Sequence, residues 1–214
     1  SELDELKKAL VWHRGLPREV VDFLKTVPNA KPMDVLRTAV SLLGVLDSTT
    51  KDNSAQANLD RALRLMAQTA TIVSTFDRVR KDLHIIEGDP KLGFAANFLY
   101  CLTGRRPDKV GERAFDVALT LHADHELNAS TFAGRVIAAT LSDIYSAMTG
   151  AIGALKGPLH GGANEDVIRL LLEVRTPEHG VEAIAAMINA KKKVPGFGHR
   201  VYRTEDPRAT HLRA

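Results

Sequence analysis

Apolar positions recur every three or four residues along most of the chain, with polar positions between them. The longest series runs from about residue 54 to residue 83 and includes Leu59, Leu63 and Met66. A helix over this segment would measure roughly 45 Å at about 1.5 Å per residue. A free coiled coil is one interpretation. Neighbouring segments are equally amphipathic and can cover the helix, so we expect a central helix of a large helical domain, or a dimer element.

Shorter helices are predicted on both sides of this segment, each delimited by a proline, a glycine or a capping residue. The pattern contains no convincing alternation of apolar and polar positions, so the chain is predicted to be all-α. The expected helices run from the first residues to Gly15, from Pro17 to Pro28, from Pro32 through Leu43, from Phe94 to Gly104, from Pro107 toward Leu121, from Ser130 or Thr131 continuously through Tyr145 to Ile152, across 167–172 and across 181–188, with one more opening in 205–214.

Composition describes an ordinary globular protein of 214 residues, 44% hydrophobic and 26% charged, with a formal net charge of +3. The positive charge is spread along the chain, which suits an anionic small molecule and gives little support to nucleic-acid binding. No apolar run approaches the length of a membrane span. Cys101 is the single cysteine, so no intrachain disulfide can form. This fits a reducing compartment, and we expect a cytoplasmic protein.

Three histidine-containing stretches carry the candidate chemistry. The first is Leu-His-Ala-Asp-His-Glu-Leu-Asn-Ala-Ser, residues 121–130. If this stretch is helical, His122 and His125, three residues apart, face the same side. Three interpretations stay open: a metal site, although the spacing differs from the His-Glu-x-x-His pattern; a structural helix end; or a polar cluster that recognises an anionic or carbonyl substrate, to which Asn128 and Ser130 add uncharged hydrogen bonds.

The second stretch is Gly-Pro-Leu-His-Gly-Gly-Ala-Asn-Glu, residues 157–165. Its three glycines and one proline can turn the chain sharply and leave little side-chain bulk around His160. The plain alternative is a glycine-rich turn between two helices with a solvated histidine. A neutral imidazole at this position could donate a hydrogen bond to a carbonyl oxygen as it gains enolate character.

The third stretch is Val-Pro-Gly-Phe-Gly-His-Arg, residues 194–200, followed by Asp206-Pro207-Arg208. The Pro-Gly-x-Gly order predicts exposed backbone that can grip a flat heterocycle or a phosphate. His199 could polarise a carbonyl group. The planar guanidinium of Arg208 fits a carboxylate, although a surface arginine beside a proline turn is the simpler alternative.

Together, these stretches resemble the citrate synthase family, in the shorter form typical of bacteria and archaea. The match rests on the His-Ala-Asp-His-Glu stretch with Asn-Ala-Ser, on Gly-Pro-Leu-His-Gly-Gly-Ala-Asn-Glu, and on Pro-Gly-Phe-Gly-His-Arg-Val-Tyr with Asp-Pro-Arg. It implies an all-α homodimer of the tricarboxylic acid cycle that condenses oxaloacetate with acetyl-CoA and water to give citrate and CoA. It also implies a large helical domain over residues 1–160 and the start of a smaller, mobile helical domain over residues 161–214.

The resemblance assigns roles to individual residues. His160 would hydrogen-bond the thioester carbonyl, and His199 would polarise the ketone of oxaloacetate. His125 and Arg208 would bind oxaloacetate, while Asn128 and Ser130 would orient the histidines. The backbone of Val194, Pro195, Gly196, Phe197 and Gly198 would meet the adenine end of CoA. The resemblance implies no metal and no permanently bound cofactor, because acetyl-CoA is a cosubstrate.

One departure from the family pattern matters most. The family's general base is an aspartate beyond the Asp-Pro-Arg stretch, and that region lies outside these 214 residues, as do further substrate arginines. We therefore expect these residues to be a fragment that is inactive by itself. Two alternatives stay open. A 2-methylcitrate synthase would use propionyl-CoA on the same motifs, and a helical scaffold or metal-binding bundle using His122 and His125 would have no catalytic role.

Overall fold

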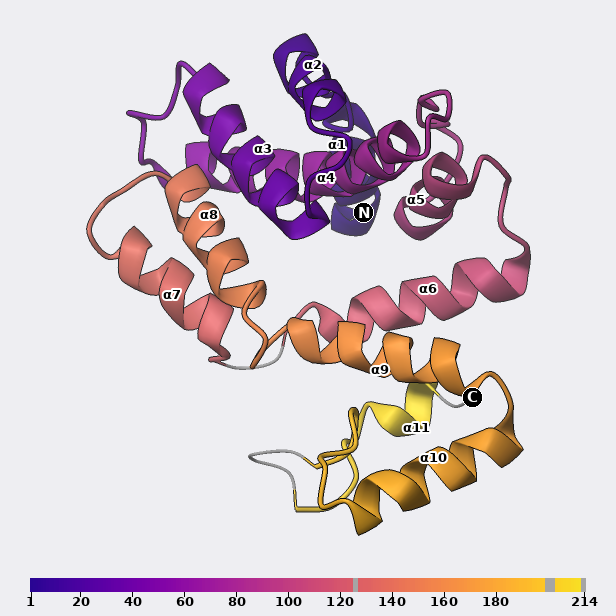
Figure 1. The fold of residues 1–214 in the computed structure, drawn as a ribbon. Coiled ribbons are helices and arrows are strands. Elements are labelled where there is room, and N and C mark those ends of the chain that lie inside the picture. Colours follow the sequence, from indigo (N-terminus) through magenta and orange to yellow (C-terminus); the bar gives the residue numbers. More distant parts are fainter. Residues whose placement is uncertain (125–126, 199–202, 213–214) are drawn as a thin grey trace. The chain divides into compact units, whose positions relative to one another are not determined.

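The computed structural model describes residues 1–124, 127–198 and 203–212, and within these ranges it contains helices and no strands (Figure 1). The all-α prediction is confirmed. The chain forms two compact units, residues 1–153 and residues 154–214. The sequence-based boundary lies slightly later, after residue 160. The assignment of these units to the large and small domains of the family stays a prediction.

The first unit contains most of the helices. Their limits agree with the prolines, glycines and capping residues in the sequence. Pro32 is the first residue of its helix, and Asp108 caps another by accepting a hydrogen bond from the Gly111 amide at 2.7 Å. Gly104 ends a helix in the left-handed conformation at φ +80°. The helices are α1 (Glu2–Trp12), α2 (Arg18–Thr26), α3 (Pro32–Leu46), α4 (Ala55–Arg80), α5 (Phe94–Thr103), α6 (Lys109–His122), α7 (Ala129–Ala138) and α8 (Ile144–Leu155).

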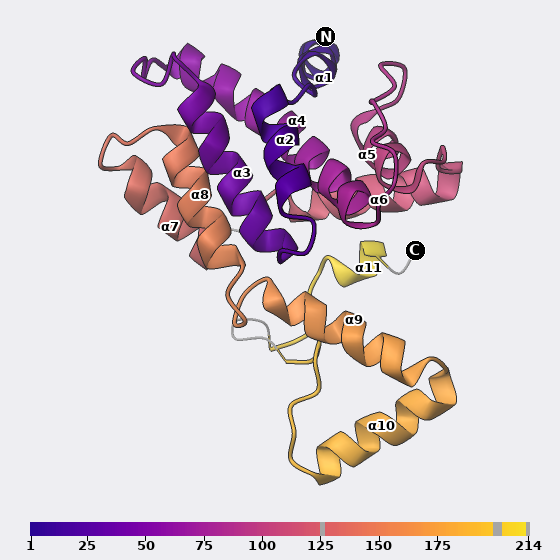
Figure 2. The same ribbon diagram turned by 45° about the horizontal axis from the view of Figure 1, so that its top comes forward.

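Helix α4 organises this unit, as the long apolar series predicts. It has 26 residues, roughly 39 Å, and begins where the Ser54 hydroxyl accepts a hydrogen bond from the Ala57 amide. It ends at Arg80, slightly before the predicted limit. Helices α1, α2, α3 and α5 all pack against it (Figure 2). The core beside it is formed by buried side chains from α2, α3, α4 and α8: Val20, Leu24, Val35, Ala39, Val40, Leu43, Leu65, Ile72, Phe76, Tyr145 and Ile152.

The single helix predicted from residue 130 to residue 152 is wrong. The chain instead forms α7 and α8, with a turn between them. Leu141 adopts φ +61°, a left-handed conformation that cannot continue a right-handed helix. Asp143 then caps α8, because its carboxylate accepts hydrogen bonds from the amide and the hydroxyl of Ser146, both at 2.9 Å. The local cap therefore overrides an apolar periodicity that continues through the turn.

Small residues bring α7 and α8 together, in agreement with their frequency in this part of the sequence. A Cβ atom on Gly150 would lie 2.1 Å from Cδ1 of Ile137, and one on Gly134 would lie 3.4 Å from the carbonyl oxygen of Ala147. The two helices lie side by side in the views of Figures 1 and 2.

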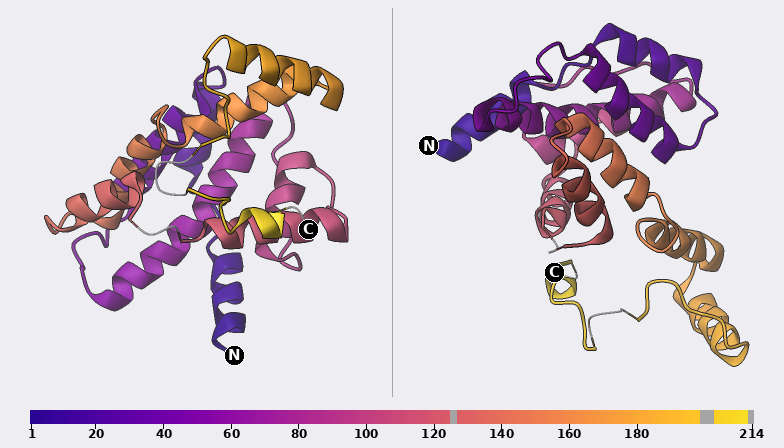
Figure 3. Two further views of the ribbon diagram at one scale, coloured as in Figure 1. Left: turned by 90° about the horizontal axis from the view of Figure 1, so that it is seen from below. Right: turned by 90° about the vertical axis from the view of Figure 1, so that its left-hand side faces the viewer.

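The second unit is built around two helices, α9 (Gly162–Val174) and α10 (Pro177–Asn189), which pack against each other (Figure 3). Arg175 turns the chain at φ +63°, and the Thr176 hydroxyl caps α10. A short helix, α11 (Ala209–Leu212), follows the Asp-Pro-Arg stretch, where a helix opening was predicted. Among the described residues, no helix combines the length and apolar character needed to cross a membrane.

Candidate active site

The His160 stretch forms the connection between α8 and α9 in the second unit. Its backbone closes through hydrogen bonds from the His160 amide to the Gly157 carbonyl and from the Gly161 amide to the Leu155 carbonyl, both 2.9 Å. Helix α9 begins at Gly162, two residues after His160, and its first turn has no side-chain cap. His160 is half-buried. His160 thus precedes a helix N-terminus, where the helix dipole favours negative charge, although the amides of Gly162 and Asn164 already donate to the carbonyls of Gly157 and Gly161, both at 3.3 Å.

Close contacts with backbone carbonyl groups leave no room for a side chain at Gly161 and little room at Gly157 and Gly162. A Cβ atom on Gly161 would lie 2.6 Å from the carbonyl oxygen of Leu155, closer than real Cβ atoms approach. Cβ atoms on Gly157 and Gly162 would lie 3.2 Å and 3.3 Å from the carbonyl oxygens of Ala154 and Gly157. The compact turn predicted around His160 therefore depends on the absence of these side chains.

The stretch 194–198 forms an exposed turn against the same helix. The Phe197 amide donates to the Val194 carbonyl at 3.3 Å, with Pro195 and Gly196 as the central residues. Gly196 adopts φ +82°, as the third position of a type II turn requires, and Gly198 adopts φ +81°. A Cβ atom on Gly196 would lie 3.1 Å from Cγ2 of Val167 in the second turn of α9. The structure thus brings this turn to the helix whose N-terminus follows His160.

Arg208 is held by a carboxylate two residues before it. Its Nε donates to Oδ1 of Asp206 at 3.0 Å, and its Nη2 donates to Oδ2 at 2.6 Å. The backbone amide of Arg208 also donates to Oδ1 at 2.9 Å. Only Arg208 was singled out for binding in this motif. The role of Asp206 was missed, although Asp and Asn commonly accept hydrogen bonds from the backbone two residues later.

Asn128 and Ser130 form the start of α7 in the first unit. The side-chain oxygen of Asn128 accepts hydrogen bonds from the Thr131 amide at 2.9 Å and from the Ser130 hydroxyl at 2.7 Å. Asn128 is therefore the cap of α7, where Ser130 or Thr131 was expected to start the helix. Their role in orienting histidines stays a prediction. His125 and His199 lie outside the described residues.

The alternative of a metal site at His122 and His125 stays untested, because His125 lies outside the described residues; among the residues that are described, no group of three or more His, Cys, Asp or Glu could hold a metal ion. Nδ1 of His122 lies 2.7 Å from the carbonyl oxygen of Ala118, one turn earlier in α6. This contact agrees with a structural role for His122 at the end of α6. His125, the other half of the pair, is not described.

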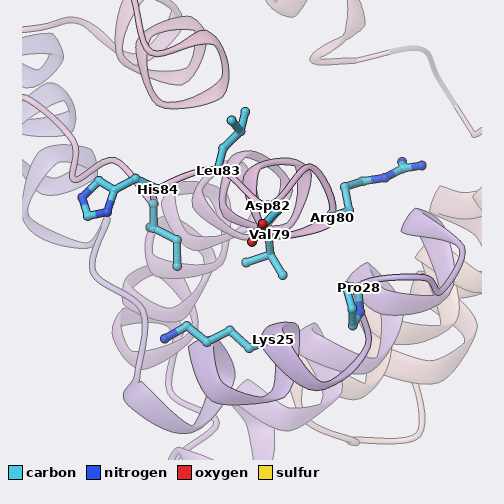
Figure 4. Close-up of a pocket in the computed structure, with 8 residues that line it drawn as sticks. Lys25, Pro28, Val79, Arg80, Asp82, Leu83 and His84 are labelled. Atoms are coloured by element: carbon cyan, nitrogen blue, oxygen red, sulfur yellow. The ribbon is translucent and has the colours of Figure 1, made fainter.

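The first unit also contains a cavity of about 630 Å³ that no sequence motif predicts (Figure 4). It lies where α2 and α4 end, and none of the predicted site residues lines it. Lys25 and Arg80 stand in the last turns of these helices, where basic side chains complement the negative end of the helix dipole. Because two helix C-termini disfavour an anion, the basic lining is explained by the helices themselves.

Comparison with known proteins identifies the family to which the chain belongs. A family model described as "Citrate synthase, C-terminal domain" matches residues 1–214. The chain belongs to the citrate synthase family. "Citrate synthase 2" of Bacillus subtilis (strain 168) is 50% identical over 215 residues, covering 100% of this chain and 58% of the relative. A "2-methylcitrate synthase" of Mycobacterium tuberculosis is 46% identical over 201 residues, covering 94% of this chain and 51% of the relative.

A solved citrate synthase shares the fold at high similarity. The enzyme of Thermoplasma acidophilum, in a ternary complex with carboxymethyl coenzyme A and oxaloacetate, has a TM-score of 0.87 and 32% identity, covering 98% of this chain and 55% of that one. The chain thus spans a little over half the length of the relatives it matches. Citrate synthases are acyltransferases, the class of enzyme that the sequence predicts.

Proposed function

We propose that these residues form part of a citrate synthase that condenses acetyl-CoA with oxaloacetate and releases citrate and CoA. The family match over the whole chain carries this proposal. The related enzyme from Thermoplasma acidophilum holds a CoA analogue and oxaloacetate, which supports the same pair of substrates here. Neither a permanently bound cofactor nor a metal is needed, because the acyl group arrives on CoA.

His160 is proposed as the donor to the thioester carbonyl. Removing a proton from the methyl group of a thioester builds negative charge on this oxygen, and a preorganised donor there typically lowers the barrier by about 3–4 kcal/mol. The position of His160 two residues before the start of α9 supports this role, because the positive end of the helix dipole favours negative charge near that start.

The remaining proposed roles divide between the two substrates. His199 polarises the ketone of oxaloacetate, and His125 and Arg208 bind its oxygens, while Asn128 and Ser130 position the histidines. The exposed type II turn at 194–198 receives the adenine end of CoA. Its open backbone and the side chain of Phe197, which is 75% exposed, provide the hydrogen-bonding groups and the flat apolar surface that a purine needs.

An assay of CoA release tests the proposal. The 214-residue chain alone should give no turnover with acetyl-CoA and oxaloacetate, because the family's general-base aspartate lies beyond it. A polypeptide of family length that carries these residues should be active and should lose most of its activity on His160→Ala. No CoA release by this longer polypeptide would contradict the proposal. Turnover by the chain alone would contradict the need for the outside aspartate.

A 2-methylcitrate synthase is the second candidate, supported by the relative from Mycobacterium tuberculosis. One additional methylene changes binding in an apolar pocket by only about 1–3 kcal/mol, so the shared motifs do not separate the two substrates. The ratio of kcat/KM for propionyl-CoA to that for acetyl-CoA, measured on the polypeptide of family length, decides between them.

We also propose a homodimer that acts in the cytoplasm in the tricarboxylic acid cycle. Exposed apolar side chains on α7 support the dimer: Phe132 is 57% exposed and Val136, one turn later, is 51% exposed. The single cysteine, Cys101, cannot form an intrachain disulfide, and this supports a reducing compartment. No nucleic acid and no membrane is assigned as a partner.

A further inference from the structure

The carboxylate of Asp206 makes more contacts with Arg208 than a local turn needs. Such a turn needs one side-chain oxygen for the backbone amide two residues later, and Oδ1 supplies it at 2.9 Å to the amide of Arg208. The same carboxylate also takes Nε and Nη2 of the guanidinium, at 3.0 Å and 2.6 Å, in a two-point contact. Both side chains are largely covered, with 24% exposure for Arg208 and 30% for Asp206. Such paired, charge-assisted contacts fix the plane of a guanidinium as well as its position.

Ordering an arginine ordinarily opposes ligand binding. The side chain has many rotamers, and a ligand that must immobilise it loses affinity. Asp206 removes this cost before the ligand arrives. It engages Nε and Nη2 of the guanidinium and so fixes the plane in which a ligand carboxylate would be bound. The carboxylate also adds a negative charge near the site, which opposes a dianion. Positioning and charge therefore predict opposite effects of removing Asp206.

We propose that Asp206 is a positioning residue that holds Arg208 ready to receive a carboxylate group of the substrate. The inference rests on the proposed function, in which Arg208 binds oxaloacetate. In this proposal Asp206 influences substrate binding through Arg208. In this way the Asp-Pro-Arg motif supplies both the guanidinium that binds the substrate and the carboxylate that orients it.

The substitution Asp206→Asn separates positioning from turn formation. Asparagine keeps an oxygen for the backbone amide and forms the same turn, but its uncharged amide cannot hold two guanidinium N–H groups. Asp108→Asn is the control, because the Asp108 carboxylate also accepts a hydrogen bond from a nearby backbone amide, that of Gly111 at 2.7 Å, and no contact with an arginine is found for its side chain among the described residues. Both variants should unfold at nearly the temperature of the parent protein.

The first measurement is the NMR signal of the Arg208 side-chain Nε–H group in the 214-residue chain. It should be sharp, distinctly shifted and slow to exchange with solvent in the parent and in Asp108→Asn, and it should merge with the signals of mobile arginines in Asp206→Asn. An Arg208 signal that Asp206→Asn leaves unchanged would overturn the proposal.

The second measurement is steady-state kinetics on a polypeptide of family length. Asp206→Asn should raise the KM for oxaloacetate about fivefold to tenfold, as expected for one released side chain, and should change kcat and the KM for acetyl-CoA by less than about twofold. An unchanged or lower KM for oxaloacetate would overturn the proposal in favour of the charge effect.

Arg208→Ala tests whether Arg208 binds oxaloacetate, as the proposed function requires. If it leaves this KM unchanged, the binding role of Arg208 itself is contradicted, whereas a rise in Arg208→Ala without one in Asp206→Asn contradicts the positioning role alone.

Discussion

Asp47, at the end of α3, is a buried carboxylate whose environment keeps it ionised. Burial by itself would raise its pKa, but hydrogen bonds from the amide and hydroxyl of Thr49, at 2.8 Å and 2.6 Å, and from the Tyr145 hydroxyl at 2.8 Å outweigh burial. The positive charge of Arg64, with Nη2 at 3.3 Å, adds to them. The pKa of Asp47 is lowered to about 2. The carboxylate thus joins α3, α4 and α8 through polar contacts.

Acid should therefore weaken the fold through Asp47. A carboxyl group whose pKa falls on folding stabilises the protein above its unfolded pKa, near 4, and this stabilisation is lost as the pH falls toward 2. The lowering of the Asp47 pKa corresponds to roughly 2 kcal/mol. The free energy of unfolding, measured with denaturant at pH 7, 4 and 2.5, should fall more steeply with acid in the parent than in Asp47→Asn. Equal slopes would contradict this account.

Tyr145 forms the other side of this contact. Burial and the hydrogen bond to Asp47 raise the pKa of Tyr145 to about 12, so its contribution is complete below pH 10 and is lost as the pH rises toward 12. Tyr145→Phe leaves the buried carboxylate one donor short and should cost about 1.5–3 kcal/mol at pH 7. Tyr100→Phe is the matched control, since no hydrogen bond to the Tyr100 hydroxyl is found among the described residues. Equal unfolding free energies for the two variants would show that the hydroxyl contact is weak.

At the scale of elements, glycine sets how closely α3 and α8 approach. A Cβ atom on Gly44 would lie 2.8 Å from Cβ of Tyr145 and 3.1 Å from its Cγ. These atoms are close to the backbone of α8, so the helices rather than a flexible side-chain end would have to move. Gly153, in α8, has open space where its Cβ would lie.

The two glycines should respond in opposite directions to alanine. Gly44→Ala should lower the free energy of unfolding by about 1–2 kcal/mol, because overpacking outweighs the better helix propensity of alanine. Gly153→Ala should raise it by up to about 1 kcal/mol, because only the propensity changes. Thermal denaturation of both variants beside the parent provides the measurement. A stabilised Gly44→Ala variant would mean that α3 and α8 are not in close contact.

At the scale of the whole molecule, the exposed apolar side chains of α7 predict an association surface. A polypeptide of family length should sediment as a dimer, and Phe132→Glu should shift it toward the monomer, because a charge buried at an apolar interface is costly. Val110→Glu is the matched control: Val110, on α6, is 78% exposed and belongs to a different helix. Dissociation by both variants, or by neither, would contradict a dimer contact through α7.

The candidate site is only partly a property of sequence motifs. The glycines around His160 and the Pro-Gly turn at 194–198 were recognised because their backbone shapes are set by local steric rules. The contact of Gly196 with Val167 and the hold of Asp206 on Arg208 were not predicted. The first depends on packing between segments well separated along the chain, and the second on a choice of side-chain rotamer that no residue pattern specifies.

The sequence by itself determined the all-α class, most helix limits and the family, because periodicity, prolines, glycines and capping residues act within a few residues of each other. Only the tertiary structure decided which helices meet. Tyr145 reaches Asp47 from 98 positions away, and Gly44 faces Tyr145 without any signal in its own neighbourhood. The division between α7 and α8 also escaped the sequence pattern, since the apolar period continues through it while one left-handed residue and one cap end the helix. Packing and burial are non-local, and a linear pattern records only what neighbours along the chain dictate.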